Sequence, residues 1–84
     1  MMWYLYIAQC ADGSLYTGIT TDPSKRLKRH NAGRGSSYVL SKGGATLLYT
    51  ERCQTRSAAV RRELEIKSWD RAEKLALIRR VRPT

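Results

Sequence analysis

The chain has 84 residues, of which 42% are hydrophobic and 27% are charged, and these proportions exclude a disordered chain. We expect a single domain over residues 1–84, because a chain this short supports one modest core. Lys and Arg number 16 against 7 Asp and Glu, which gives a formal charge of +9. This excess predicts a polyanionic partner. Nucleic acid is the leading candidate, and ribosomal RNA or an anionic membrane surface is the alternative.

The first residues lack the basic segment and the long apolar run of a signal peptide. No stretch has the length of a transmembrane helix. We therefore expect a cytoplasmic protein without a membrane partner, and the sequence indicates no obligate protein partner. Cys10 and Cys53 fit a reducing compartment as small buried apolar residues. Two cysteines and one histidine offer no zinc-finger spacing.

The chain opens with the pattern of a β-hairpin. Residues from Met2 to Cys10 and from Leu15 to Thr20 are rich in strand formers. The tripeptide Ala11-Asp12-Gly13 between them is a turn signal.

The loop length of this hairpin decides where its tyrosines point. A loop of two residues pairs Tyr16 with Gln9 and places Tyr6 and Tyr16 on opposite faces. A loop of three residues, with Gly13 in the left-handed region, pairs Tyr16 with Ala8 and places both tyrosines on one face. Both loops are sterically reasonable, and only the longer one lets the tyrosines share a site.

A basic helix follows the hairpin. Asp22 and Pro23 predict a helix start, because an acid caps the first turn and proline there lacks only an N–H that has no partner. The helix should run to about Asn31. Arg26 and His30 are four residues apart and therefore share a face.

The stretch from Pro23 to Thr50 contains no carboxylate. Within it, the Gly- and Ser-rich segment from Gly33 to Gly44 predicts a mobile loop. The stretch holds six Lys or Arg residues and one His, which make the sharpest charge asymmetry in the chain: Lys25, Arg26, Lys28, Arg29, His30, Arg34 and Lys42.

The second half of the chain predicts one strand and two helices. The strand spans Ala45 to Arg52, and a helix begins at Thr55 or Ser57 and runs to about Ser68. Val60 and Leu64 would lie on the apolar side of that helix.

Asp70 and Glu73 have the spacing of a capping box and predict a last helix to about Arg80, with Leu75 and Ile78 facing the core. Together the elements predict an α+β fold. It consists of a three-stranded antiparallel sheet flanked by about three helices, in the order β-β-α-β-α-α.

Phosphodiester hydrolysis needs a base for the attacking water, a cation near the developing charge, a donor for the phosphate and relief for the leaving group. Tyrosine can act as a base where nearby cations favour the phenolate, the arginine fork donates two bonds to a phosphate, and a carboxylate can hold Mg²⁺. Taken singly, each candidate has an ordinary structural role. Residue types alone therefore support only a small basic α/β domain that binds nucleic acid. The candidates are Tyr6, Tyr16, Arg26, His30, Tyr38 and Glu63.

Three strings occur in order: Tyr4-Leu5-Tyr6-Ile7, Tyr16-Thr17-Gly18-Ile19-Thr20, and Lys25-Arg26-Leu27-Lys28-Arg29-His30-Asn31. Together they resemble the GIY-YIG nuclease superfamily, and especially its small stand-alone bacterial members. The segment from Arg61 to Lys67 resembles the acidic helix of that superfamily. The resemblance covers nearly the whole chain.

The resemblance implies a metal-dependent endonuclease that cuts DNA, either structured or single-stranded, and a cofactor of Mg²⁺ or Mn²⁺ held by Glu63. It implies catalytic roles for Tyr6, Tyr16, Arg26 and His30, with Tyr6 the first choice as base. DNA is favoured over RNA as the partner. We expect these further residues to contact the nucleic acid: Lys25, Arg29, Arg34, Tyr38, Lys42 and Lys67.

The sequence also departs from the family pattern. Tyr4, Leu5 and Thr17 replace apolar or small residues of the two motif halves. Some members use an asparagine beyond the metal glutamate, and no residue after Glu63 matches it. The alternative function is therefore a nucleic-acid-binding module of the same fold with weak or lost catalysis. Beyond this family, a small RNA-associated protein without an active site and a basic partner for an acidic protein stay open.

Overall fold

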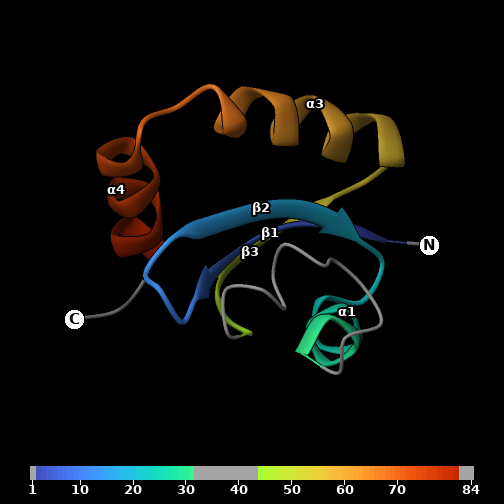
Figure 1. The fold of residues 1–84 in the computed structure, drawn as a ribbon. Coiled ribbons are helices and arrows are strands. Elements are labelled where there is room, and N and C mark those ends of the chain that lie inside the picture. Colours follow the sequence, from blue (N-terminus) through green and yellow to red (C-terminus); the bar gives the residue numbers. More distant parts are fainter. Residues whose placement is uncertain (1, 32–43, 82–84) are drawn as a thin grey trace.

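The computed structural model describes the backbone of residues 2–31 and 44–81, and their side chains apart from those of residues 29–31 and 81. Figure 1 shows an antiparallel sheet in the order β2-β1-β3, with helices on both faces. This arrangement confirms the predicted α+β fold. The elements are β1 (Trp3–Cys10), β2 (Leu15–Thr20), α1 (Pro23–Asn31), β3 (Ala45–Cys53), α3 (Arg56–Lys67) and α4 (Arg71–Val81).

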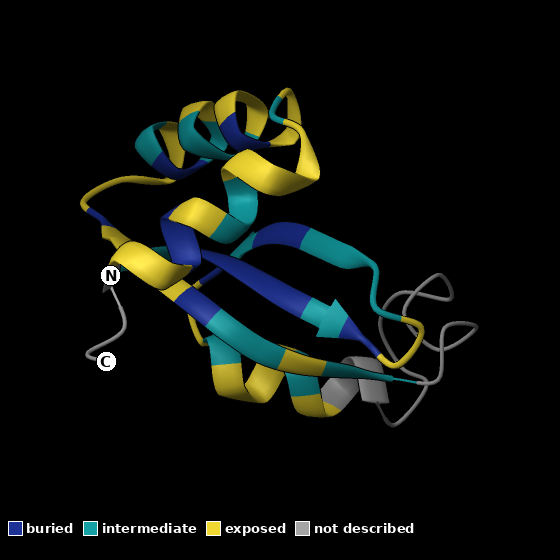
Figure 2. Ribbon diagram, turned by 90° about the vertical axis from the view of Figure 1, so that its left-hand side faces the viewer, coloured by how far each residue is buried: buried dark blue, intermediate teal, exposed yellow. Residues whose placement is uncertain are grey.

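The helices form two layers around the sheet. Helices α3 and α4 cover one face and α1 lies on the other (Figure 1). Strand β1 is hydrogen-bonded on both sides, so Leu5 and Ile7 are fully buried, and Figure 2 shows the buried residues gathered along the sheet. Strand β2 is an edge strand.

The hairpin adopts the three-residue loop. Tyr16 pairs with Ala8, and Gly13 has a φ of 91°. The Cys10 N–H donates to the carbonyl of Ser14 at 2.8 Å and closes the loop. This register confirms the alternative that places Tyr6 and Tyr16 on the same face of the sheet.

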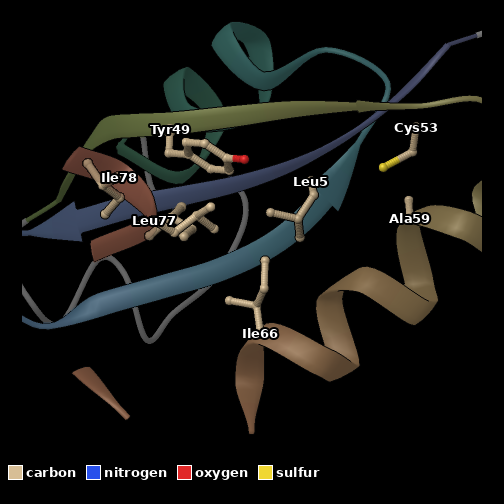
Figure 3. Close-up of a cluster of buried hydrophobic side chains, with 8 residues drawn as sticks. Leu5, Tyr49, Cys53, Ala59, Ile66, Leu77 and Ile78 are labelled. Carbon is tan, nitrogen blue, oxygen red and sulfur yellow. The ribbon is translucent and has the colours of Figure 1, made fainter. Parts of the chain in front are cut away.

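The core lies between the sheet and the pair α3 and α4 (Figure 3). Cys10 and Cys53 are buried free thiols, as predicted. Because alternate residues of β1 point to opposite faces, the face that carries Leu5 is the core face, and Tyr6 points to the face covered by α1. The core side chains are Leu5, Ile7, Tyr49, Cys53, Ala59, Ile66, Leu77 and Ile78.

The predicted helix caps are confirmed. The Asp22 carboxylate accepts from the N–H of Lys25 at 3.0 Å, and the Thr55 hydroxyl accepts from a first-turn N–H at 3.1 Å. Asp70 and Glu73 each accept from the other's backbone N–H, at 2.8 and 3.2 Å, which is the reciprocal pattern of a capping box.

The apolar side assigned to α3 is wrong. Ala59 and Ile66 are the buried residues of this helix, whereas Leu64 is 63% exposed and Val60 is half-buried. At about 100° per residue, Leu64 lies about 150° from the midline of the two buried side chains. Arg62 of the same helix binds Glu51 on β3.

This ion pair lies at the border of the core. Arg62 donates to both carboxylate oxygens of Glu51, at 2.8 and 3.2 Å, and also to Glu65. The Tyr49 hydroxyl donates to Glu51 at 2.7 Å. Burial and this hydrogen bond raise the pKa of Tyr49 to about 12. The network therefore connects α3 to β3 through a neutral tyrosine and a bidentate arginine.

Two buried threonines of β2 give a matched prediction. The Thr17 hydroxyl is buried and has no hydrogen-bond partner among the described residues, whereas the Thr20 hydroxyl accepts from the N–H of Asp22 at 3.2 Å. Thr17→Val should raise the free energy of unfolding by about 1 kcal/mol, and Thr20→Val should lower it by about the same amount. Urea unfolding measures both, and equal destabilisation by the two substitutions would contradict the assignment of hydrogen bonds.

Candidate active site

Tyr6 crosses the edge strand at Gly18. The two residues are paired across β1 and β2. A Cβ atom at Gly18 would lie 2.6 Å from the Tyr6 hydroxyl oxygen and 2.8 Å from the ring carbon that bears it. Any side chain at position 18 would force the Tyr6 ring to shift, and the lack of one brings the Tyr6 hydroxyl over β2.

Tyr16 lies beside Tyr6 on the same face. The ring centroids are 6.2 Å apart and the rings are tilted by 34°. Tyr6 is 2% exposed, while Tyr16 is half-buried. Burial, together with the neighbouring Tyr16, raises the pKa of Tyr6 well above its ordinary value. Tyr6 is therefore a neutral phenol at ordinary pH, and Tyr16 is the tyrosine that solvent reaches.

Charges from both sides of the sheet act on the Tyr6 hydroxyl. Arg26 on α1 lowers the pKa of Tyr6, and Glu63 on α3 raises it. Arg26 and Glu63 come from helices on opposite faces, and Tyr6 lies across the edge strand between them. Of the predicted side chains, Tyr6 and Tyr16 are therefore in ring contact, and Arg26 and Glu63 lie near enough to shift the pKa of Tyr6.

The rotation of α3 directs Glu63 to this edge. Measured from the midline of Ala59 and Ile66, Arg62 lies about 50° to one side and Glu63 about 50° to the other. Arg62 points to Glu51 on β3, so Glu63 points away from β3 toward β1 and β2, against which α3 also packs. The ion pair and the Glu63 carboxylate therefore lie on opposite flanks of the helix.

A hollow lies beside Arg26 at the beginning of α1. Its volume is about 210 Å³, and its walls include Lys25 and Arg26. The hydroxyl-bearing residues Thr20 and Thr21 and the capping Asp22 complete it. Two cations and several polar groups around one hollow suit a phosphate.

Glu63 fits a magnesium ion better than a zinc ion. No group of three or more His, Cys, Asp or Glu that could hold a metal occurs in the described part of the chain, and zinc sites need three or four such ligands. Magnesium is commonly held by one or two carboxylates together with substrate phosphates and water. The Glu63 side chain is 20% exposed, and its carboxylate lies 3.4 Å from the Lys67 ammonium. Such an i,i+4 pair is worth only about 0.2–0.5 kcal/mol.

The remaining predicted site residues divide into two groups. Lys25 and Lys67 are exposed at the ends of the site. The side chains of Arg29 and His30 and the whole of Arg34, Tyr38 and Lys42 lie outside the described residues. Sequence reasoning missed Lys74, which lines a hollow with Tyr16 and Lys67; the only signal was its position seven residues after Lys67.

The arrangement defines a small basic α+β protein whose polar site suits phosphate chemistry. The family model of the GIY-YIG catalytic domain matches residues 2–76. The chain therefore belongs to the GIY-YIG family, a nuclease family whose substrates are nucleic acids.

Two relatives align with this chain over most of its length. UPF0213 protein HQ_3675A of Haloquadratum walsbyi is 49% identical over 74 residues, which cover 88% of this chain and 83% of that protein. UPF0213 protein SH2523 of Staphylococcus haemolyticus is 45% identical over 75 residues, which cover 89% and 92%. These names state no activity or substrate.

Two solved structures have the same fold. The solution NMR structure of UPF0213 protein BH0048 from Bacillus halodurans matches with a TM-score of 0.62 and 38% identity, covering 96% of this chain and 86% of that one. The solution NMR structure of EF2693 from E. faecalis matches with a TM-score of 0.65 and 37% identity, covering 94% and 84%. Within the described residues, no helix is both long enough and apolar enough to cross a membrane.

Gly18→Ala should lower the free energy of unfolding by about 1–3 kcal/mol, because the added Cβ overlaps the Tyr6 ring, which is buried and must shift to make room. The gain from a less flexible unfolded chain, about 0.4–1 kcal/mol, does not offset this cost. Urea unfolding measures the change.

The control is the double variant Gly18→Ala/Tyr6→Leu, which lacks the overlapping ring atoms. It should be more stable than the sum of the two single effects predicts, by at least about 1 kcal/mol. Additive effects would show that Tyr6 does not cross β2 at Gly18.

Proposed function

We propose that this protein is a metal-dependent endonuclease that hydrolyses phosphodiester bonds in DNA, with structured or single-stranded DNA as its substrate. The observation that carries the proposal is the placement of Tyr6 and Tyr16 side by side at β2, in a chain whose residues 2–76 match the GIY-YIG catalytic domain. A base, a phosphate-binding cation and a metal-binding carboxylate are the groups that the reaction needs.

The base is Tyr16. A buried phenol with a raised pKa is a poor base, and Tyr6 is such a group. Tyr16 reaches solvent, where the attacking water comes from. The choice of Tyr16 over Tyr6 thus rests on burial, which the sequence alone could not provide.

The other groups act on the phosphate. The Arg26 guanidinium donates to two of its oxygens and stabilises the charge that develops there. The neutral Tyr6 hydroxyl donates a hydrogen bond at the same place. Mg²⁺ bound to Glu63 would supply Lewis-acid polarisation of the phosphate. His30, one helical turn after Arg26, would assist proton movement.

The basic residues bind the rest of the nucleic acid. Lys25 lies in the hollow beside Arg26, and the segment from Arg34 to Lys42 would follow the backbone. Contacts of this kind are made to phosphates and position the substrate without reading its sequence. DNA is our proposed substrate, and RNA is the direct competitor to test.

The alternative is a nucleic-acid-binding module with weak or lost catalysis. The observation in its favour is that no asparagine follows Glu63 in the sequence. This alternative predicts salt-sensitive binding of DNA or RNA and no metal-dependent cleavage.

The first test is a cleavage assay on linear, branched and flapped DNA and on the matching RNAs, with Mg²⁺, with Mn²⁺ and with chelator. Glu63→Gln should lower the cleavage rate at least about 100-fold, because a lost metal ion removes several kcal/mol of stabilisation from the transition state. The matched control is Glu65→Gln, which lies on the same helix and contacts Arg62 instead. Cleavage by the Glu63 variant at the parental rate would rule out this site, and the absence of metal-dependent cleavage on every substrate would favour the binding module.

The second test separates the two tyrosines. Tyr16→Phe should lower the cleavage rate by about 10²–10⁴, because the proposed base is gone. Tyr6→Phe should lose less activity, because it removes one hydrogen-bond donor to the phosphate. The cleavage rates of the two variants decide the assignment, and a larger loss in the Tyr6 variant would identify Tyr6 as the base.

A further inference from the structure

A second hollow lies between β2 and the helices α3 and α4, across the edge strand from the tyrosine pair. Its volume is about 230 Å³. Three consecutive residues of β2 form one wall, and the last residue of α3 and a residue of α4 form the other. The lining residues are Leu15, Tyr16, Thr17, Lys67 and Lys74.

The charge of this hollow is positive. Within the described part of the chain, Lys74 has no carboxylate partner. Lys67 is 53% exposed and shares its charge with Glu63. The acidic residues nearest to Lys74 in the sequence are Asp70 and Glu73. Each accepts a hydrogen bond from the other's backbone N–H at the beginning of α4.

The wall that carries Lys74 is held against the hairpin. The Arg71 guanidinium donates to the carbonyl of Gly13 at 2.7 Å, which fixes the beginning of α4 to the hairpin loop. One turn further, Lys74 is half-buried and faces β2. The lysine is therefore positioned by the fold.

We propose that this hollow binds a backbone phosphate of the nucleic acid, next to the phosphate that is cut. Lys67 and Lys74 form its two cationic walls, and lysine binds phosphate well as a point charge. Tyr16 lies on the edge strand and borders both the hollow and the tyrosine pair, so a nucleic-acid strand held by Arg26 would pass around this edge at Tyr16 to reach the corner between α3 and α4. The identity of the ligand rests on the proposed function.

The first experiment measures binding of a short single-stranded DNA to the full chain in EDTA, over a series of salt concentrations. Lys74→Met keeps the aliphatic stem and removes the charge. It should weaken binding several-fold and reduce the slope of log K against log salt by about 0.7, which is the value for one phosphate contact on a single strand. Arg79→Met removes one charge from an exposed position of the same helix and should leave the slope unchanged. Equal slopes for Lys74→Met and the parent, or equal losses in both variants, would overturn the proposal.

The second experiment locates the phosphate. Neutral methylphosphonate linkages are placed one at a time along the oligonucleotide. One position should weaken the parent and leave Lys74→Met unaffected, because the variant no longer contacts that phosphate. Lys74→Arg keeps the charge and should respond like the parent. If every linkage weakens Lys74→Met as much as the parent, Lys74 contacts no phosphate.

The cleavage assay distinguishes a failure of this inference from a failure of the proposed function. If the parent binds with the predicted dependence on Lys74 but never cuts, the phosphate site stands and the nuclease proposal fails. If the parent cuts and Lys74→Met has an unchanged KM, the nuclease proposal stands and the phosphate site fails.

Discussion

The site depends on one close contact, the passage of the Tyr6 ring over Gly18. Tyr6 belongs to the central strand, whose neighbours hold it on both sides. Its hydroxyl nevertheless reaches the edge strand, because the paired residue has no side chain. A buried, rigid phenol is thereby placed where Tyr16, Arg26 and Glu63 can act on it. The site is built on the edge strand β2. Residues of this strand also line two hollows, one beside Arg26 and one beside Lys74.

Helix α3 combines a structural and a chemical task in adjacent residues. Arg62 makes a partly buried, bidentate ion pair with Glu51, and breaking such a pair from one side leaves an uncompensated charge. Ala59 and Ile66 are the buried residues of the helix, and Leu64 is exposed on the opposite side. In this orientation Glu63 lies on the flank opposite Arg62. Substitutions at Arg62 are expected to loosen α3 from β3 and so to disturb Glu63 without touching it.

Much of the fold could be predicted because the local signals are strong. The caps at Asp22, Thr55 and Asp70 and the strand patterns give elements whose bounds agree with the structure within two residues. The sequence allows two loop lengths, since Asp-Gly suits both, and only the pairing of Tyr16 with Ala8 decides between them. Periodicity favours Val60 and Leu64 as the apolar side of α3, whereas packing against the sheet buries Ala59 and Ile66.

The site was predicted through resemblance more than through spacing. A tyrosine in a strand or a glutamate in a helix is ordinary by itself, and their convergence depends on how the helices pack. Burial of Tyr6, which shifts the proposed base to Tyr16, is a property of the folded state. Lys74 could not be singled out either, since its place beside Tyr16 follows from the corner between α3 and α4. Lys74 is the residue of α4 that lines this hollow. The sequence has no asparagine after Glu63.

The most direct test of the central claim is paramagnetic relaxation by Mn²⁺, read from the amide and side-chain signals of the labelled protein. The proposed site predicts that broadening is centred on Glu63 and is strongest for Tyr6, Tyr16 and Gly18 among the sheet residues. It also predicts that Glu63→Gln abolishes the broadening. Broadening centred on Asp70 and Glu73, or on Glu51 and Glu65, that survives Glu63→Gln would contradict the account.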